Sequence, residues 1–328
     1  MSAAQRTIIR WTVKIAVSAG LMAFLLHKIP SHEIMALVSR ADRGLLLAVT
    51  VVFMASNVLG WFQWHVLLRS SGVNLPGPHT FRFYFIGLFF NNFLPANIGG
   101  DAVKVYDLTR EGESAYQMIA VTLLDRLLGV FSLCVLAVAA ELLLVGRQGG
   151  MHHVLYLGVF IACMMPALGF YFFRPLGNWL RRSVLKLHAL SINARATAII
   201  DHLSPFRGRR GLVTRLVLLS SVIQAMRVLT HVLVGMAIGI PMTPLTVAQF
   251  FVFIPLLSLA MIPPITINGL GIREGLGILL FAEAGIVRTD AFVLEFATYI
   301  ISVAVSLVGF AFFLARKAAA PARVAPEP

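Results

Sequence analysis

Long apolar stretches separated by short polar segments run through this chain. No charged residue occurs in 44–68, 151–173 or 296–314, and 228–272 is likewise free of charge. About 20 consecutive apolar residues cross a bilayer as an α-helix. The pattern therefore predicts an all-α, polytopic membrane protein. About six full spans are expected, near residues 8–28, 44–68, 115–146, 151–173, 212–238 and 290–315.

Composition excludes a soluble domain. The chain is 59% hydrophobic and 12% charged, whereas soluble domains carry about 25% charged residues. No cleavage site of small residues follows the first apolar stretch, so we interpret that stretch as an uncleaved span. Cys134 and Cys163 both lie in apolar spans and imply no disulfide framework. We predict one membrane domain over 1–318 and a disordered tail at 319–328.

Basic residues are concentrated in one segment. The formal net charge is +13, and 174–215 holds nine Lys and Arg residues against one acidic residue. In a membrane protein such a segment is typically cytoplasmic, so no nucleic-acid partner is needed to explain the charge. Apolar residues recur there at steps of three or four, which predicts an amphipathic surface helix. Its part Arg181–Arg210 would contact anionic headgroups, although a loop that only fixes the topology is an alternative.

Two apolar stretches are predicted to enter the membrane and return on their own side. With 80–113 and 246–285 treated in this way, both chain termini and most Lys and Arg residues fall on the cytoplasmic side. The mouth of the first hairpin then faces the cytoplasm and that of the second faces the opposite side.

The two returning stretches also resemble each other in sequence. Residues 95–104 and 264–273 both match P-x-x-I-x-G-x-x-x-K/R, and an acidic residue, Asp125 or Glu295, follows 30 or 31 positions after the proline. Together with the opposite orientations, this predicts an inverted repeat, an arrangement in which transporters bind substrate near the midplane. The predicted repeats are 44–146 and 212–315.

Proline and glycine should break both hairpins inside the membrane. Lipid offers no hydrogen-bond partners, so we expect the broken tips to meet at a polar cavity; tight turns at the membrane surface are the alternative. Glycine-rich turns that open a helix present amide groups suited to phosphate, although Asp101 could equally be a simple helix cap. The expected breaks are Pro95, Pro263 and Pro264. The candidate substrate-binding residues are Asn91, Asn92, Asn97, Gly99, Gly100, Asp101, Lys104, Asn268, Gly269, Gly271, Arg273 and Glu274.

Four charged residues are expected at membrane depth, namely Asp125, Arg126, Arg227 and Glu295. Each such charge costs about 2.5 to 3.5 kcal/mol on insertion scales, so each needs a partner. Asp125 and Arg126 are adjacent and point to different sides of a helix, which makes Arg227 and Glu295 their candidate partners. The four could couple transport to protons, or they could form ion pairs that only hold helices together.

Signals for catalysis are weak. The sequence contains no metal-binding motif, no nucleophile elbow and no ATP-binding loop. We therefore expect no metal or cofactor, and a transporter rather than an enzyme.

Three runs carry a family resemblance: NNFLPANIGGDAVK at 91–104, DRLLG at 125–129 and PPITINGLGIREG at 263–275. Together they resemble the lysylphosphatidylglycerol synthase transmembrane family, also called flippase-like membrane proteins. The resemblance implies movement of aminoacylated phosphatidylglycerol between leaflets, and relatives are linked to lipid-carried sugar pathways. It implies no aminoacylation here, because the soluble transferase domain of two-domain members is not part of this chain. The chain departs from the family pattern at Asn268, where glycine is common, and at Lys104, where arginine is frequent.

The leading prediction is a lipid translocator of a bacterial plasma (inner) membrane, with both termini cytoplasmic. Its partner would be a phospholipid or a polyprenyl-linked lipid, whose phosphate is held by the hairpins while its tails remain in the bilayer. One alternative is a membrane enzyme of lipid-linked glycan or phospholipid metabolism that uses Asp101 or Asp125. Another is a scaffold partner of a glycosyltransferase.

Overall fold

The computed structural model describes residues 31–93, 99–148, 150–172, 199, 201–203, 206, 208–263, 266 and 268–315. The predicted span at 8–28, the tail at 319–328 and most of the basic segment lie outside these residues. Within the described part the regular structure is helical, without strands. The principal helices are α2 (Ser31–Arg40), α3 (Arg43–Ser70), α4 (Gly77–Phe93), α5 (Gly99–Arg110), α6 (Ala115–Gln148), α7 (Met151–Phe172), α10 (Arg210–Ala237), α11 (Pro244–Ala260), α12 (Ile272–Ala282) and α13 (Arg288–Leu314).

Long apolar helices occupy the predicted spans. Among the described residues, α3, α6, α10 and α13 each contain a segment long and apolar enough to cross a membrane. They match the spans predicted near 44–68, 115–146, 212–238 and 290–315. The fifth, predicted at 151–173, corresponds to α7, which has 22 residues. The all-α membrane fold is therefore confirmed.

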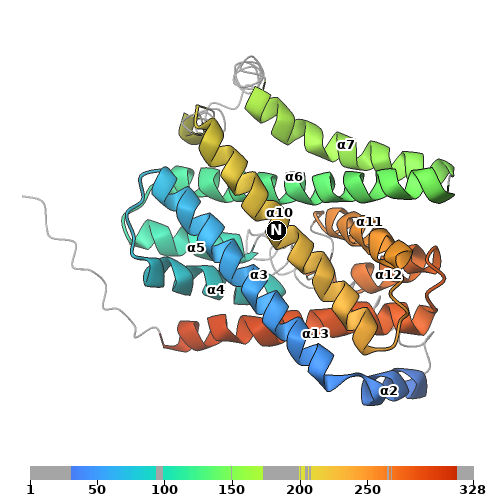
Figure 1. Ribbon diagram of the computed structural model, residues 1–328. Helices are drawn as coiled ribbons and strands as arrows, with labels where there is room; N and C mark the ends of the chain where they lie inside the picture. Colours follow the sequence, from blue (N-terminus) through green and yellow to red (C-terminus); the bar gives the residue numbers. More distant parts are fainter. Residues whose placement is uncertain are drawn as a thin grey trace, which may run out of the picture.

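The two returning stretches are helical hairpins, α4 with α5 and α11 with α12. Their helices have 17, 12, 17 and 11 residues, which at about 1.5 Å per residue is less than the roughly 30 Å of a bilayer core. We define the Ser70 end of the bundle as the end where α3 stops, and the Arg43 end as the end where α3 begins. The α4–α5 hairpin opens toward the Ser70 end and the α11–α12 hairpin toward the Arg43 end (Figure 1). The opposite orientations agree with the predicted inverted repeat.

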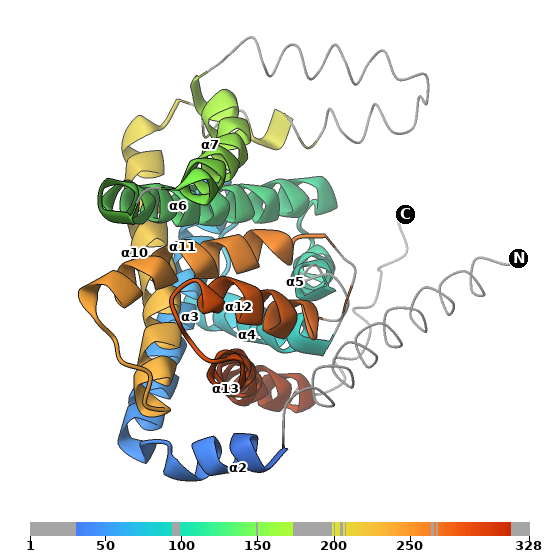
Figure 2. The same ribbon diagram turned by 90° about the vertical axis from the view of Figure 1, so that its right-hand side faces the viewer.

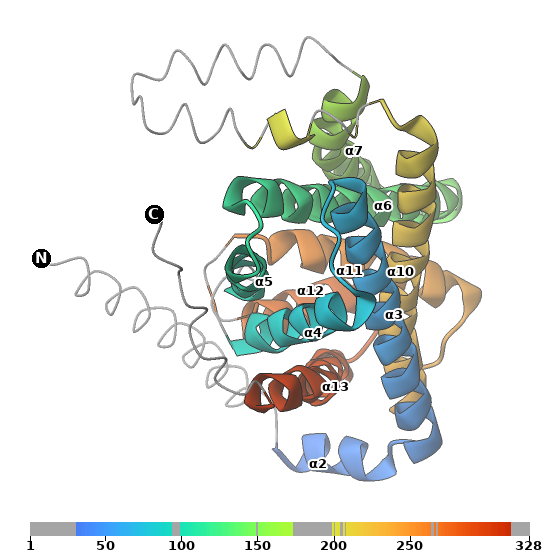
Figure 3. The same ribbon diagram turned by 90° about the vertical axis from the view of Figure 1, so that its left-hand side faces the viewer.

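The helices form a stack with two helices crossing its side. α7, α6, α11, α12 and α13 follow one another through the stack, while α3 and α10 pack together along one flank (Figures 2 and 3). Each hairpin packs against the last span of the other repeat. α4 of the first repeat contacts α13 of the second, and α11 of the second contacts α6 of the first. The two repeats are thus interlocked.

Local signals explain where several helices begin. Asp42 precedes α3, and its Oδ1 accepts hydrogen bonds from the amides of Gly44 and Leu45 at 2.7 and 3.0 Å. Thr243 caps α11 in the same way, and Pro244 follows at the first helical position. These caps satisfy amides that helix formation leaves unbonded.

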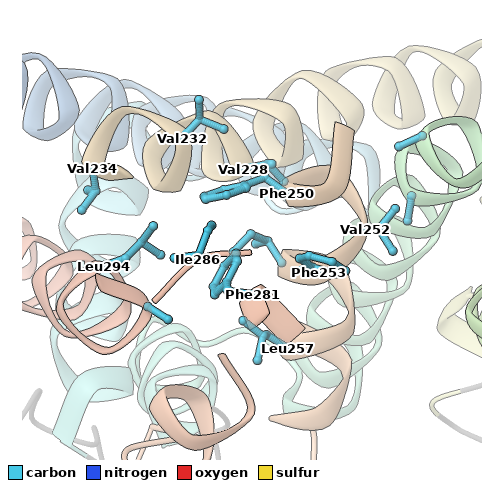
Figure 4. Close-up of a cluster of buried hydrophobic side chains, with 14 of the residues drawn as sticks. Val228, Val232, Val234, Phe250, Val252, Phe253, Leu257, Phe281, Ile286 and Leu294 are labelled. Carbon is cyan, nitrogen blue, oxygen red and sulfur yellow. The ribbon is translucent and has the colours of Figure 1, made fainter. Parts of the chain in front are cut away.

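Two apolar cores support the hairpins. One lies where α10, α11, α12 and α13 meet and includes the fully buried Val228, Phe250, Phe281 and Leu294 (Figure 4). The second joins α3, α4, α5 and α6 around residues such as Trp64, Phe85 and Val121. Each hairpin is therefore anchored by its own core.

Candidate functional site

A cavity of about 730 Å³ lies where the two hairpins approach each other. Its walls come from every principal helix except α2. Small-molecule sites typically occupy about 300 to 1,000 Å³, so this cavity is large enough for a ligand. The charged residues in its walls are Asp101, Lys104, Asp125, Arg126, Arg227, Arg273 and Glu295.

The hairpin tips contact each other directly. Nδ2 of Asn268 donates a 2.8 Å hydrogen bond to Oδ1 of Asn92 on α4. The Ser302 hydroxyl on α13 donates to the same oxygen at 3.4 Å. Asn268 has a φ of 47°, a left-handed conformation that asparagine tolerates better than most residues. The tips therefore meet inside the bundle, as the sequence predicted.

On the first hairpin, the Asp101 carboxylate contacts two cations, Lys104 on the same helix and Arg126 on α6. Asp101 Oδ1 lies 2.7 Å from Lys104 Nζ, and Asp101 Oδ2 lies 2.5 Å from Nε of Arg126 on α6. Lys104 is 6% exposed, and its ammonium group also lies 5.2 Å from the Trp64 ring and 5.3 Å from the Tyr84 ring. Aromatic faces attract cations, particularly where water is excluded. Asp101 is thus part of an ion-pair network, beyond the capping role considered from sequence.

The second hairpin contributes a related but looser arrangement. Nε of Arg273 lies 3.6 Å from Oε2 of Glu295, and Nη2 lies 3.5 Å from Oε1 of Glu274. The guanidinium group also lies 4.9 Å from the Tyr299 ring. Glu295 is fully buried, yet in the described part neither of its carboxylate oxygens has a hydrogen-bond partner. Glu295 thus lies beside Arg273 without a direct hydrogen bond to it.

Two amides expected to bind phosphate are already bonded. The Gly100 amide donates to Oδ1 of Asn91 at 2.8 Å, and the Gly271 amide donates to Oε2 of Glu274 at 2.6 Å. Glu274 is fully buried and caps α12. These contacts close the turns of the hairpins. An anion in the cavity would therefore meet cationic side chains rather than these two amides.

The partners of the intramembrane charges differ from those expected. Asp125 accepts a 2.8 Å hydrogen bond from Nε2 of Gln63 on α3, and Arg126 pairs with Asp101 on α5. Sequence had suggested Arg227 and Glu295 for these roles. Asp125 and Arg126, which are adjacent on α6, do contact different helices, as their positions on that helix required.

Arg227 differs from the other cations of the cavity. It lies on α10 and lines the cavity, but no ion pair joins it to a carboxylate within the described ranges. A charged group at membrane depth is costly without a partner. Arg227 is therefore the cation best placed to receive an anion from outside the chain.

The structure sorts the predicted site residues into two groups. Those that line the cavity are Asn91, Asp101, Lys104, Asp125, Arg126, Arg227, Arg273 and Glu295. Those that instead shape the hairpins or their contact are Asn92, Gly99, Gly100, Asn268, Gly269, Gly271 and Glu274. Pro263 follows α11 in the connection to α12. Pro95, Asn97, Pro264 and most of Arg181–Arg210 lie outside the described residues.

Sequence reasoning missed several side chains around the cavity. Gln63, Trp64, Tyr84 and Tyr299 hold the charged groups, but no spacing rule marks them. His231 had a signal, since it belongs to the repeated His-Val-Leu that precedes each hairpin; its Nε2 lies 3.8 Å from Oε1 of Glu295. Across the described part of the chain, no group of three or more His, Cys, Asp and Glu residues is arranged to hold a metal ion.

Comparisons with known proteins point to one family. A family model described as lysylphosphatidylglycerol synthase TM region matches residues 11–322. A UPF0104 membrane protein of Pyrococcus horikoshii is 28% identical over 131 residues, a stretch that covers 39% of each chain. The chain thus matches about two-fifths of that relative's length. The family match and the long apolar helices agree on an integral membrane protein.

Proposed function

Because this chain belongs to the lysylphosphatidylglycerol synthase transmembrane family, we propose that it moves a lipid with a phosphate-containing headgroup between the leaflets of a membrane. The headgroup would occupy the cavity between the hairpins. Orientation is part of the proposal: the Ser70 end faces the cytoplasm of a bacterial inner membrane, because exposed basic residues such as Arg69, Arg210 and Arg215 lie there.

The position of Arg227 in the cavity wall is the observation that carries this proposal. Four cations and three carboxylates line its walls, and Arg227 has no carboxylate partner in the part of the chain that is described. A phosphate would give Arg227 an anionic partner and accept hydrogen bonds from its guanidinium group. A neutral or cationic headgroup without phosphate would leave Arg227 with only its longer-range interaction with Asp125.

Opposite hairpin orientations support a transport cycle. A site between two elements that open to opposite faces can be exposed to one leaflet and then to the other by modest rearrangement. Because α4 packs on α13 and α11 packs on α6, neither repeat moves alone. In our proposal the moving unit combines a hairpin with a span from the other repeat, and Asp125 or Glu295 couples the movement to protons.

A variant pair on α10 tests the role of Arg227. In proteoliposomes that contain a fluorescent phosphatidylglycerol, Arg227→Gln should slow leaflet exchange about tenfold or more, since a hydrogen bond to a charged group contributes about 1.5 to 3 kcal/mol. Arg215→Gln removes an exposed arginine from the same helix and should leave the rate unchanged. Quenching of the outer-leaflet dye with dithionite measures the exchange.

Several outcomes would contradict the proposal. Equal rates for the two variants would exclude Arg227 as the phosphate ligand. An absence of exchange by the wild type with phosphatidylglycerol, phosphatidylethanolamine and a polyprenyl phosphate would exclude lipid translocation. A covalent change in the lipids, detected by mass spectrometry of the same vesicles, would favour the enzyme predicted as an alternative from sequence.

A further inference from the structure

Charged groups occupy only part of the cavity. A second region is walled by apolar side chains from α6, α11 and α7, which we call the apolar wall. Its residues are Leu127, Val130, Leu133, Ile254, Leu257 and Cys163. Contact with such an apolar surface would not stabilise a polar headgroup or its phosphate.

The apolar wall continues away from the charges along α6. Leu133 is two helical turns beyond Arg126, or about 10 Å at 1.5 Å per residue, in the direction of the Arg43 end. The Ser258 hydroxyl, which also lines the cavity, donates to the Ile254 carbonyl at 2.8 Å. The hydroxyl hydrogen of Ser258 is therefore already bonded within α11. This apolar wall suits a hydrocarbon chain better than a second polar group.

Two apolar residues of the cavity wall also reach the surface of the bundle. Leu123 on α6 and Ile262 after α11 both line it, and both lie at the surface of the bundle, 43% and 52% exposed. α6 and α11 are neighbouring layers of the stack (Figure 2). In a membrane an apolar surface of this kind meets the hydrocarbon of the bilayer, so Leu123 and Ile262 link the cavity wall to lipid.

We infer that the apolar wall binds one hydrocarbon chain of the transported lipid, which enters from the bilayer between Leu123 and Ile262. This inference rests on the proposed function and changes one sequence-based expectation, that all tails remain in the bilayer. A chain that passes from lipid into the apolar wall exchanges one apolar medium for another. The wall therefore keeps a tail beside the headgroup without adding selectivity, which stays with the charged residues.

A photo-crosslinking experiment tests the inference. The full chain is reconstituted in vesicles with a phosphatidylglycerol that carries a diazirine at the end of one acyl chain, and adducts are mapped by mass spectrometry. We expect adducts at residues 127–133 and 254–257, and a fivefold or greater loss of them in Leu133→Trp, which fills the wall. Leu142→Trp, at a 59% exposed position of the same helix, should leave them unchanged.

A second variant covers the case in which Leu133→Trp fails to fold. Leu123→Trp alters the cavity wall only at a surface position, and should also lower the adducts at the apolar wall. Adducts spread evenly over the lipid-facing helices of the wild type would overturn the inference. Leaflet exchange measured on the same vesicles separates the two proposals: exchange without wall adducts overturns tail binding alone, and wall adducts without exchange overturn translocation alone.

Discussion

Lys104 and Arg273 occupy equivalent positions in the two hairpins but are held with different strength. Lys104 lies 2.7 Å from its carboxylate partner Asp101, a hydrogen-bond distance. Arg273 lies 3.6 Å from Glu295 and 3.5 Å from Glu274, and longer contacts are weaker. We therefore expect Arg273 to change partner more readily than Lys104 when a ligand enters, and Lys104 chiefly to stabilise the first hairpin.

Asp101→Asn tests this structural role. The change leaves Lys104 and Arg126 without their shared counter-charge, and breaking a buried ion pair costs about 3 to 5 kcal/mol. We expect a clear decrease in stability, measured by thermal unfolding in a mild detergent. Glu111→Gln, at an exposed position just after α5, serves as the control. Equal unfolding temperatures for the two variants would show that Asp101 does not hold the network together.

At the scale of elements, α4 packs against α5 and α13 through close backbone contacts that only glycine permits. A Cβ atom on Gly100 would overlap the Gly87 carbonyl, and one on Gly309 would overlap the Phe85 carbonyl. Both contacts bring backbone against backbone, so no side-chain movement can relieve them. The first hairpin therefore depends on close packing as well as on its hydrogen bonds.

Gly100→Ala should consequently destabilise the protein. Overpacking usually costs about 1 to 3 kcal/mol, and here the obstacle is rigid backbone. The expected result is a lower unfolding temperature and a smaller monodisperse fraction on size-exclusion chromatography. The matched control is Gly158→Ala on α7, where a Cβ would meet open space. If both variants behave like the wild type, the close approach of α4 and α5 is not required for folding.

At the scale of the whole molecule, the hairpins enter from opposite ends and meet at Asn92 and Asn268. The interlocked packing of each hairpin on the other repeat places the cavity between the two ends of the bundle. This arrangement is what a site reached alternately from two leaflets requires.

Cysteine labelling tests the opposite orientations. In a background with Cys134→Ala and Cys163→Ala, cysteine replaces either Glu111 after α5 or Val287 before α13, both exposed. A membrane-impermeant thiol reagent added outside intact cells should label Val287→Cys, and should label Glu111→Cys only after permeabilisation. Labelling of both positions from the same side would contradict the arrangement.

Local sequence was enough to determine the class of protein and the position of most helices. The span predicted at 44–68 is α3 (Arg43–Ser70), and the one predicted at 212–238 is α10 (Arg210–Ala237). Length and apolarity decide such segments, because a helix in lipid satisfies its own backbone hydrogen bonds. The two interrupted stretches were also predicted, and in the second the interruption includes Gly269 and Gly271, whose positive φ values suit glycine.

Only the tertiary structure decided which polar groups meet. Asp101 pairs with Arg126 across 25 positions, and Gln63 bonds Asp125 across 62. The Gly271 amide is taken by Glu274 instead of being left for a phosphate. Such contacts depend on how each helix is rotated and on how the tips are angled, which packing sets once the helices assemble. Apolar pattern determines whether a segment is helical in the membrane, whereas the partner of a buried charge depends on the neighbours that packing brings to it.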